Sequence, residues 1–151
     1  MSLEELVKDV MEKNVQTVDL DASAKKSAAV MGKKGIGSLV VVQGGTAVGI
    51  VTERDLVSRV IADGLDPAKV LVRDIMSTPL ITIQPDAKIA EAARLMNEYK
   101  IRRVVVTAAD GSLAGIVTAS DLARVLAERK DYSDMTLNAI ARASPDKGPY
   151  Q

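Results

Sequence analysis

The chain has 151 residues and carries 20 Lys and Arg against 20 Asp and Glu, so its formal net charge is zero. It contains no Cys, His, Trp or Phe, which excludes disulfides, Cys-ligated zinc, a histidine general base and aromatic platforms for stacking nucleic acid bases. The balanced charge argues against general binding of DNA or RNA, and a hydrophobic fraction of 47% is enough for a packed core.

The N-terminal stretch predicts a helix and not a targeting segment. Residues Ser2 to Glu5 have the form of a capping box, which predicts a short helix that ends near Val10. Early charges interrupt any signal-peptide pattern, and no apolar run approaches the roughly 18 residues of a membrane span. We therefore expect a cytoplasmic protein with no membrane segment.

The first half of the chain predicts five elements from apolar spacing and turn residues. They are a strand at 15–18, a helix from Asp21 or Ser23 to Lys33, strands at 38–43 and 47–52 joined by Gly44 and Gly45, and a helix at 53–62. In the first of these helices, Ala24, Ala28 and Met31 are spaced for one buried face.

The second half predicts the same order of elements again, followed by a tail. They are a strand at 81–83, helix 88–99, strands 103–107 and 113–118, helix 119–128, and one more short helix at 133–143 before a tail at 144–151. Each copy is therefore strand, helix, strand, strand, helix.

The order of elements repeats because the sequence itself repeats. Gly49–Leu56 returns as Gly115–Leu122 with the pattern Gly-Ile-Val-Thr-x-x-Asp-Leu, and Val7–Met11 aligns with Val72–Met76. We expect an α+β fold in which two tandem copies form a closed pseudo-two-fold pair around one core. The expected organisation is repeat 1 at 1–64 with the N-terminal helix, a linker at 65–70, repeat 2 at 71–130, and the tail at 131–151.

Each repeated motif predicts a strand that runs directly into a helix. Thr52 and Thr118 are placed to cap these helices, and Asp55 and Asp121 fall in their first turns. As helix caps alone they would contribute about 1 kcal/mol each and would need no ligand.

The combination resembles a pair of CBS domains, the module often called a Bateman domain. The residues that carry the resemblance are Val10-Met11 and Ile75-Met76, the hairpin strands, and the two Gly-Ile-Val-Thr-x-x-Asp-Leu endings. The resemblance covers about Val7 to Glu128. It implies clefts between the copies, an adenosine-containing regulatory ligand (AMP, ADP, ATP or S-adenosylmethionine type), control of a separate effector protein, and pairing into a homodimer.

The resemblance implies that Asp121 and Asp55 hold a ribose, since a carboxylate can accept hydrogen bonds from two adjacent hydroxyls. Thr118, Thr52 and Ser120 are candidates for ribose or phosphate. Arg102 and Arg103 are the phosphate candidates, because two guanidinium groups at a strand entrance suit a diphosphate or triphosphate. Arg54 can add a further cation. The alternative is a solvated arginine pair.

The two copies differ in charge where the arginines lie. Gly37 and Ser38 occupy the positions of Arg102 and Arg103 in the first copy. We therefore expect one phosphorylated ligand per chain and not two.

The base requires an apolar slot with backbone groups along its edge. Two matching segments near the strand starts, with two isoleucines as walls, are the candidates, and each residue is equally well explained as core. They are Val15, Gln16, Thr17, Thr78, Leu80, Ile81, Thr82, Ile36 and Ile101.

Three functions compete at this point. The first is the regulatory adenosine-binding module. The second is a ligand-free structural or protein-interaction module that dimerises through helices 55–62 and 121–127. The third is an enzyme, which the sequence disfavours because it shows no nucleophile with a base, no metal site and no P-loop. We therefore expect no catalytic residue, no metal and no catalytic cofactor.

Overall fold

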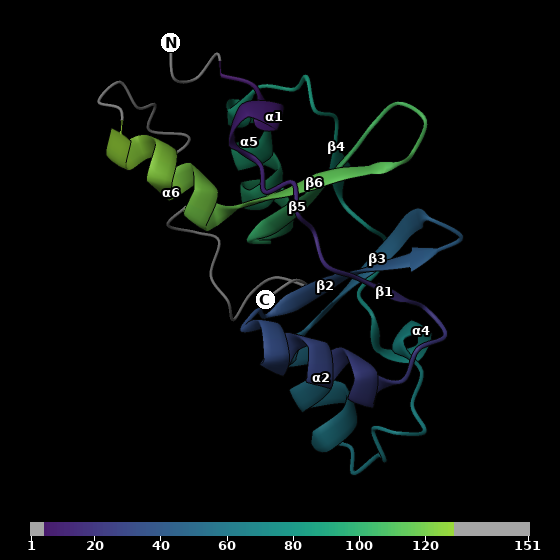
Figure 1. Ribbon diagram of the computed structural model, residues 1–151. Coiled ribbons are helices and arrows are strands. Elements are labelled where there is room, and N and C mark those ends of the chain that lie inside the picture. The colour runs from purple at the N-terminus through teal and green to yellow at the C-terminus, as the bar shows by residue number, and fades with distance from the viewer. Residues whose placement is uncertain (1–4, 129–151) are drawn as a thin grey trace. The chain divides into compact units, whose positions relative to one another are not determined.

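The computed structural model describes residues 5–128, which form two compact units. Unit 1 contains residues 5–14 and 81–128, and unit 2 contains residues 15–80. Figure 1 colours both by position in the chain. The predicted helix at 133–143, the tail and the start of the predicted N-terminal capping box lie outside the described residues.

Unit 2 is a three-stranded sheet with helices, in the strand order β1-β2-β3. β1 is parallel to β2, and β2 is antiparallel to β3. Its elements are β1 (Thr17–Asp19), α2 (Ala24–Lys34), β2 (Ser38–Gln43), β3 (Thr46–Thr52), α3 (Glu53–Leu56), the π-helix η2 (Val57–Ile61) and α4 (Val72–Ile75). Ser23 is the residue that caps α2, because its Oγ accepts the Lys26 N–H at 3.1 Å.

Unit 1 repeats this arrangement in the strand order β4-β5-β6, again with one parallel and one antiparallel pair. Its elements are α1 (Val7–Val10), β4 (Thr82–Ile83), α5 (Ile89–Tyr99), β5 (Arg103–Thr107), β6 (Leu113–Thr118) and α6 (Ala119–Glu128). The α+β class and the order strand, helix, strand, strand, helix in each copy are confirmed.

Both units have aliphatic cores. Val18, Leu39, Val41 and Val51 of the sheet pack with Met31 of α2 in unit 2. The predicted buried face of α2 is wrong at one position, since Ala28 is exposed. In unit 1 all four core-facing residues of α5 are buried, namely Ile89, Ala92, Ala93 and Met96. No helix in the described range has the length and apolar character needed to cross a bilayer.

Several elements differ from the sequence-based expectation, mostly by one residue at an end. The first strand is 17–19 and not 15–18, and the helix expected at 53–62 becomes a π-helix after its first turn, where the Ala62 N–H bonds to the Val57 carbonyl at 2.8 Å. The short helix α4 was not expected. It has four residues and no side-chain cap, so it lacks both the length and the capping residue by which a helix is recognised in a sequence.

The short helices α1 and α4 are exchanged between the sequence repeats. α1 begins the first repeat, yet its Val7 N–H bonds to the Ala87 carbonyl of unit 1 at 2.8 Å. α4 begins the second repeat, yet its Val72 N–H bonds to the Ala22 carbonyl of unit 2 at 2.8 Å. Each unit is therefore built from one repeat and the short helix that belongs, in sequence, to the other.

A glycine in each repeated motif makes room for the segment that follows the short helix. In unit 1, Glu12 and Ile116 exchange backbone hydrogen bonds of 2.9 and 3.0 Å beside Gly115. A Cβ on Gly115 would lie 2.6 Å from Met11 Sδ and 2.8 Å from the Glu12 carbonyl oxygen. Gly49 has the same role beside Met76 in unit 2. The glycine that begins the motif is thus required by close backbone approach.

We expect Gly115→Ala to destabilise the protein by about 1–3 kcal/mol, the usual cost of forcing an extra methyl into a packed site. Gly32→Ala is the matched control, because a Cβ there meets nothing within 4 Å and alanine is favoured inside a helix by about 0.5–1 kcal/mol. Urea unfolding measures both. Equal stability of Gly115→Ala and the parent would contradict the steric argument.

Candidate functional site

The corner between β6 and α6 in unit 1 is held by two reciprocal hydrogen bonds. The Thr118 N–H donates to Asp121 Oδ2 at 2.8 Å, and Thr118 Oγ1 accepts the Asp121 N–H at 3.1 Å. This is a capping box with Asp in the third position. The side chain of Asp121 is 13% exposed and is therefore not completely buried.

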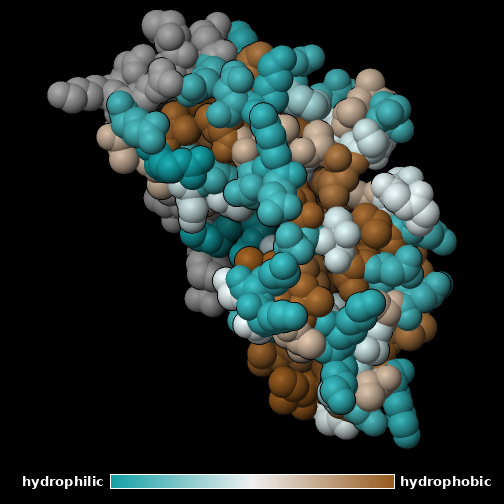
Figure 2. All heavy atoms as spheres, viewed as in Figure 1, coloured by the Kyte–Doolittle hydropathy of each residue, from teal (hydrophilic) through white to brown (hydrophobic). Residues whose placement is uncertain are grey.

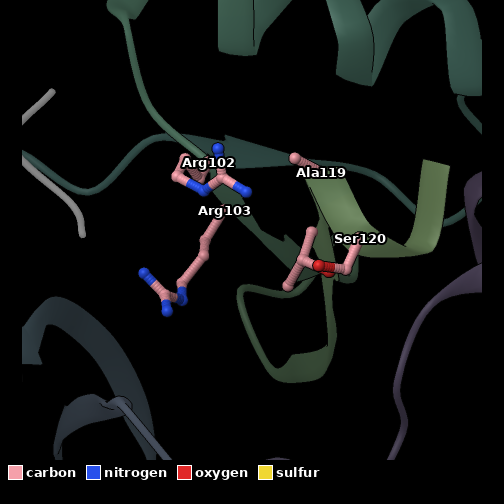
Figure 3. Close-up of a pocket in the computed structure, with 5 residues that line it drawn as sticks. Arg102, Arg103, Ala119 and Ser120 are labelled. Atoms are coloured by element: carbon pink, nitrogen blue, oxygen red, sulfur yellow. The ribbon is translucent and has the colours of Figure 1, made fainter. Parts of the chain in front are cut away.

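A hollow of about 100 Å³ lies beside this corner. Arg102, Arg103, Thr118, Ala119 and Ser120 line it. In Figure 3 the two arginine side chains extend on one side, and the first turn of α6 with Ala119 and Ser120 forms the other. The Ala119 N–H donates to the Arg102 carbonyl at 2.9 Å, which fixes the start of β5 against the start of α6. Four of the predicted site residues are therefore brought together around one opening.

The corresponding corner in unit 2 has the same bonds but a closed surrounding. Thr52 and Asp55 form a full capping box, with the Thr52 N–H to Asp55 Oδ2 at 2.9 Å. Asp55 is only 4% exposed, and its Oδ1 accepts the Ser77 hydroxyl at 3.4 Å. Gly37 takes the place of Arg102, and its carbonyl accepts the Glu53 N–H at 3.0 Å. This corner offers neither the arginines nor an exposed carboxylate.

Burial changes the acidity of Asp55. Desolvation raises its pKa above the ordinary value of 3.8, although hydrogen bonds from Thr52 and Ser77 and the nearby Arg59 charge act in the opposite direction. The carboxylate is thus held at a cost in its charged form. This environment is typical of a structural cap.

Two arginines complete the corners, and the sequence analysis missed both. In unit 1, Arg124 Nη1 lies 2.9 Å from Asp121 Oδ1 and Nη2 donates to the Val10 carbonyl at 3.3 Å. In unit 2, Arg59 Nη1 donates to the Ile75 carbonyl at 2.9 Å and lies 3.8 Å from Asp55 Oδ1. The sequence did contain a signal for these pairs, because Arg124 follows Asp121 by three residues and Arg59 follows Asp55 by four, spacings that bring side chains together on a helix.

The remaining predicted site residues are distributed over the two units. Arg54 is exposed in the first turn of α3, Ile36 packs against the core of unit 2, and Ile101 is completely buried. The predicted base-binding segment at 78–82 is divided, with Thr78 and Leu80 in unit 2 and Ile81 and Thr82 in unit 1. Val15, Gln16 and Thr17 lie at the start of unit 2.

Comparison with protein families identifies the repeat. The model of the CBS domain matches residues 7–62 and 72–128, which is more than half of the chain. The chain belongs to the CBS domain family. An uncharacterized protein of Methanopyrus kandleri is 41% identical over 120 residues, which make up 79% of this chain and 61% of that protein. The chain therefore spans less than two thirds of that relative.

Two solved CBS proteins hold adenosine-containing molecules. The structure of CBSX2 in complex with AMP is 27% identical, has a TM-score of 0.72, and is matched over 83% of this chain and 98% of its own. The CBS domain pair of protein MJ0100 in complex with 5′-methylthioadenosine and S-adenosyl-L-methionine is 29% identical, has a TM-score of 0.75, and is matched over the same shares.

The raised pKa of Asp55 predicts a pH dependence of stability. The folded carboxyl binds its proton more tightly than the unfolded one, so between the two pKa values unfolding releases a proton and rising pH favours the unfolded state. We expect the free energy of unfolding of the parent, relative to Asp55→Asn, to fall as pH rises above 3.8 and then to level off.

Asparagine is a suitable comparison because its amide oxygen still accepts the Thr52 N–H and it does not titrate. Urea unfolding of both proteins between about pH 3.5 and 7 measures the difference. A difference that stays constant or grows with pH would show that burial does not dominate the ionisation of Asp55.

Proposed function

We propose that this CBS protein is a regulatory module that binds an adenosine-containing ligand at the corner of unit 1. The observation that carries the proposal is the hollow lined by Arg102, Arg103, Thr118 and Ser120. Asp121 does not line it, but its carboxylate accepts the N–H of Thr118, which does. The AMP, methylthioadenosine and S-adenosylmethionine held by the two solved relatives support the ligand class.

The chemistry of the corner divides between phosphate and ribose. Arg102 and Arg103 supply two positive charges and planar donors that suit phosphate oxygens, and the first turn of α6 adds the positive end of a helix dipole. Asp121 accepts the hydroxyls of the ribose. The hollow of about 100 Å³ is well below the roughly 300–1,000 Å³ of a pocket that encloses a whole ligand. It therefore suits the phosphate, with the nucleoside outside it.

The base-binding residues are part of the same proposal. In unit 1, Ile81 and Thr82 lie at the start of β4, where the Ile81 carbonyl accepts the Val105 N–H at 3.3 Å. Thr82 is exposed and lies on the same unit as Asp121 and the arginines. We place the edge of the purine along this segment. Ile101 is completely buried, so it can contact the base only after a change that exposes its side chain.

One phosphorylated ligand per chain follows from the contrast between the two corners. Unit 2 has Gly37 and Ser38 at the arginine positions, and its Asp55 is buried beneath Ser77. A ribose would have to displace the Ser77 hydroxyl there, and a phosphate would find no matching arginine pair. We assign the occupied site to unit 1.

The ligand acts by linkage in this proposal. Binding only to the folded state stabilises it, and a conformation that binds the ligand better becomes more populated. An effector protein that contacts this conformation would then respond to the concentration of the ligand.

The second candidate function is self-association through an apolar face of unit 2. A hollow of about 260 Å³ between α2 and the helical segment after β3 is lined by Ala28, Met31, Gly32, Glu53, Leu56, Val57 and Ile61. Val57 is 57% and Ile61 is 70% exposed. Figure 2 shows apolar atoms gathered over these helices, at the lower end of the view. Exposed apolar surface of this kind marks an interaction site, and we propose a second copy of the chain as its partner.

We expect a selective thermal shift with one class of adenosyl ligand. At a ligand concentration 100 times its dissociation constant, linkage predicts about 2.7 kcal/mol, which moves the midpoint by several degrees. The panel is AMP, ADP, ATP, S-adenosylmethionine, 5′-methylthioadenosine and GMP. Asp121→Ala should lose the shift, measured from its own ligand-free midpoint.

Asp86→Ala is the matched control, because it removes a carboxylate of unit 1 that is 81% exposed and does not line the hollow. It should keep the shift. Absence of a shift with every ligand, in protein free of carried-over nucleotide, would favour the ligand-free interaction module. An undiminished shift in Asp121→Ala would remove the site from this corner.

We expect Ile61→Glu to convert a dimer to a monomer in size-exclusion chromatography with light scattering, since a charge in an apolar interface stays unpaired and desolvated. Ala29→Glu is the control, because it adds the same charge at an exposed α2 position outside the hollow. A monomeric parent, or a dimer that survives Ile61→Glu, would contradict this interface.

A further inference from the structure

Arg124 connects the Asp121 carboxylate to the end of α1 through its two terminal nitrogens. Nη1 donates to Asp121 Oδ1 at 2.9 Å, and Nη2 donates to the Val10 carbonyl at 3.3 Å. Val10 is the last residue of α1. One guanidinium group thus joins the candidate ribose acceptor of unit 1 to the short helix docked on the same unit.

The two oxygens of Asp121 are not equally available to a ligand. Oδ2 accepts the Thr118 N–H at 2.8 Å and is part of the helix cap. Oδ1 is bound by Arg124, and the side chain as a whole is only 13% exposed. A ribose diol needs carboxylate lone pairs for two hydroxyls. Each oxygen keeps a further lone pair, but Oδ2 is held within the cap, so a ribose that binds at Oδ1 meets Arg124 there.

Arg124 is the more easily displaced of the two partners of Asp121. Its side chain is 54% exposed, whereas that of Asp121 is 13% exposed, so water reaches the pair from the arginine side and weakens it. Its guanidinium can return to water without a large desolvation cost. The backbone donor from Thr118 is fixed by the corner and stays.

Unit 2 provides the contrast that defines the role. There Arg59 also reaches the carbonyl of the preceding short helix, at 2.9 Å from Ile75, but its distance to Asp55 Oδ1 is 3.8 Å. The Ser77 hydroxyl occupies that oxygen instead. In the sequence repeat, Glu12 stands at the position of Ser77. Both arginines are about half exposed, but only Arg124 donates a hydrogen bond to the carboxylate of its own unit, at 2.9 Å.

We propose that Arg124 is a positioning residue that competes with the ribose for Asp121 and thereby couples ligand occupancy to the docking of α1. The inference rests on the proposed function and names its regulation. When ribose hydroxyls take Oδ1, Arg124 loses one of its two anchors, and its bond to the Val10 carbonyl is weakened. By reciprocity, loosening of α1 favours the ligand.

The first test separates the ribose from the rest of the ligand. Isothermal titration compares AMP with 2′,3′-dideoxyadenosine monophosphate on the parent, Arg124→Gln and Arg59→Gln. We expect Arg124→Gln to bind AMP more tightly, by up to about fivefold if the exposed ion pair is worth about 1 kcal/mol. Its affinity for the dideoxy analogue should be unchanged, and Arg59→Gln should match the parent for both.

The second test follows α1 directly. Hydrogen exchange of residues 6–12 should speed up when AMP binds the parent, and it should be fast and insensitive to AMP in Arg124→Gln. A purely structural arginine would raise exchange in the variant without changing the ratio of the two affinities.

The outcomes distinguish this inference from the function on which it rests. A parent that binds no AMP or other adenosyl ligand overturns both. A parent that binds AMP while Arg124→Gln binds it equally or less tightly overturns the coupling alone. Tighter binding of both nucleotides also overturns it, because the gain would then be independent of the ribose.

Discussion

The reciprocal hydrogen bonds between a threonine and the aspartate three residues later fix the geometry of each unit. They join the end of the last strand to the start of the next helix without an intervening loop, so that the first turn of the helix lies beside the entrance of the neighbouring strand. Because Thr118 and Asp121 satisfy each other, the carboxylate is held in one orientation. The result is an acceptor of fixed orientation, bonded to one of the residues that line the hollow with the two arginines.

The same corner has two different environments in one chain. In unit 2 the Asp55 carboxylate is buried and accepts the Ser77 hydroxyl. Burial disfavours its charged form and raises its pKa. In unit 1 the corner is open, with guanidinium groups and a helix start around it. The asymmetry is chemical, since the backbone hydrogen bonds of the two corners are alike.

The sequence predicted the parts of the fold that depend on local chemistry. Apolar periodicity placed the strands and long helices, and the Thr-x-x-Asp motif placed both caps, because a cap acts within one turn of chain. The exchange of α1 and α4 depends on pairing between distant segments that no local pattern encodes, and the four-residue helices themselves carry no side-chain cap. The π-helix η2 (Val57–Ile61) contains no glycine or proline that would mark a departure from α-helix in the sequence.

In the candidate site, too, the sequence predicted the residues that belong to a local pattern and missed those that depend on distant contacts. Asp121, Thr118, Arg102 and Arg103 were predicted because they are adjacent to the motif or stand out by charge. Ser77 and Arg124 act through contacts with residues far along the chain, at separations of 22 and 114 residues. Exposure was also beyond reach of the sequence, since Asp55 and Asp121 have the same motif and differ only in what packs around them.

The exchange of short helices imposes an order on folding during synthesis. Unit 2 is continuous from residue 15 to residue 80, so all of its partners are present as soon as Leu80 has left the ribosome. Unit 1 is interrupted, and α1 is made first but has to wait for β4, α5 and β6 before its docking surface exists. Domains fold as units once they are complete. We therefore expect unit 2 to fold first. α1 can dock only after the rest of unit 1 has been synthesised.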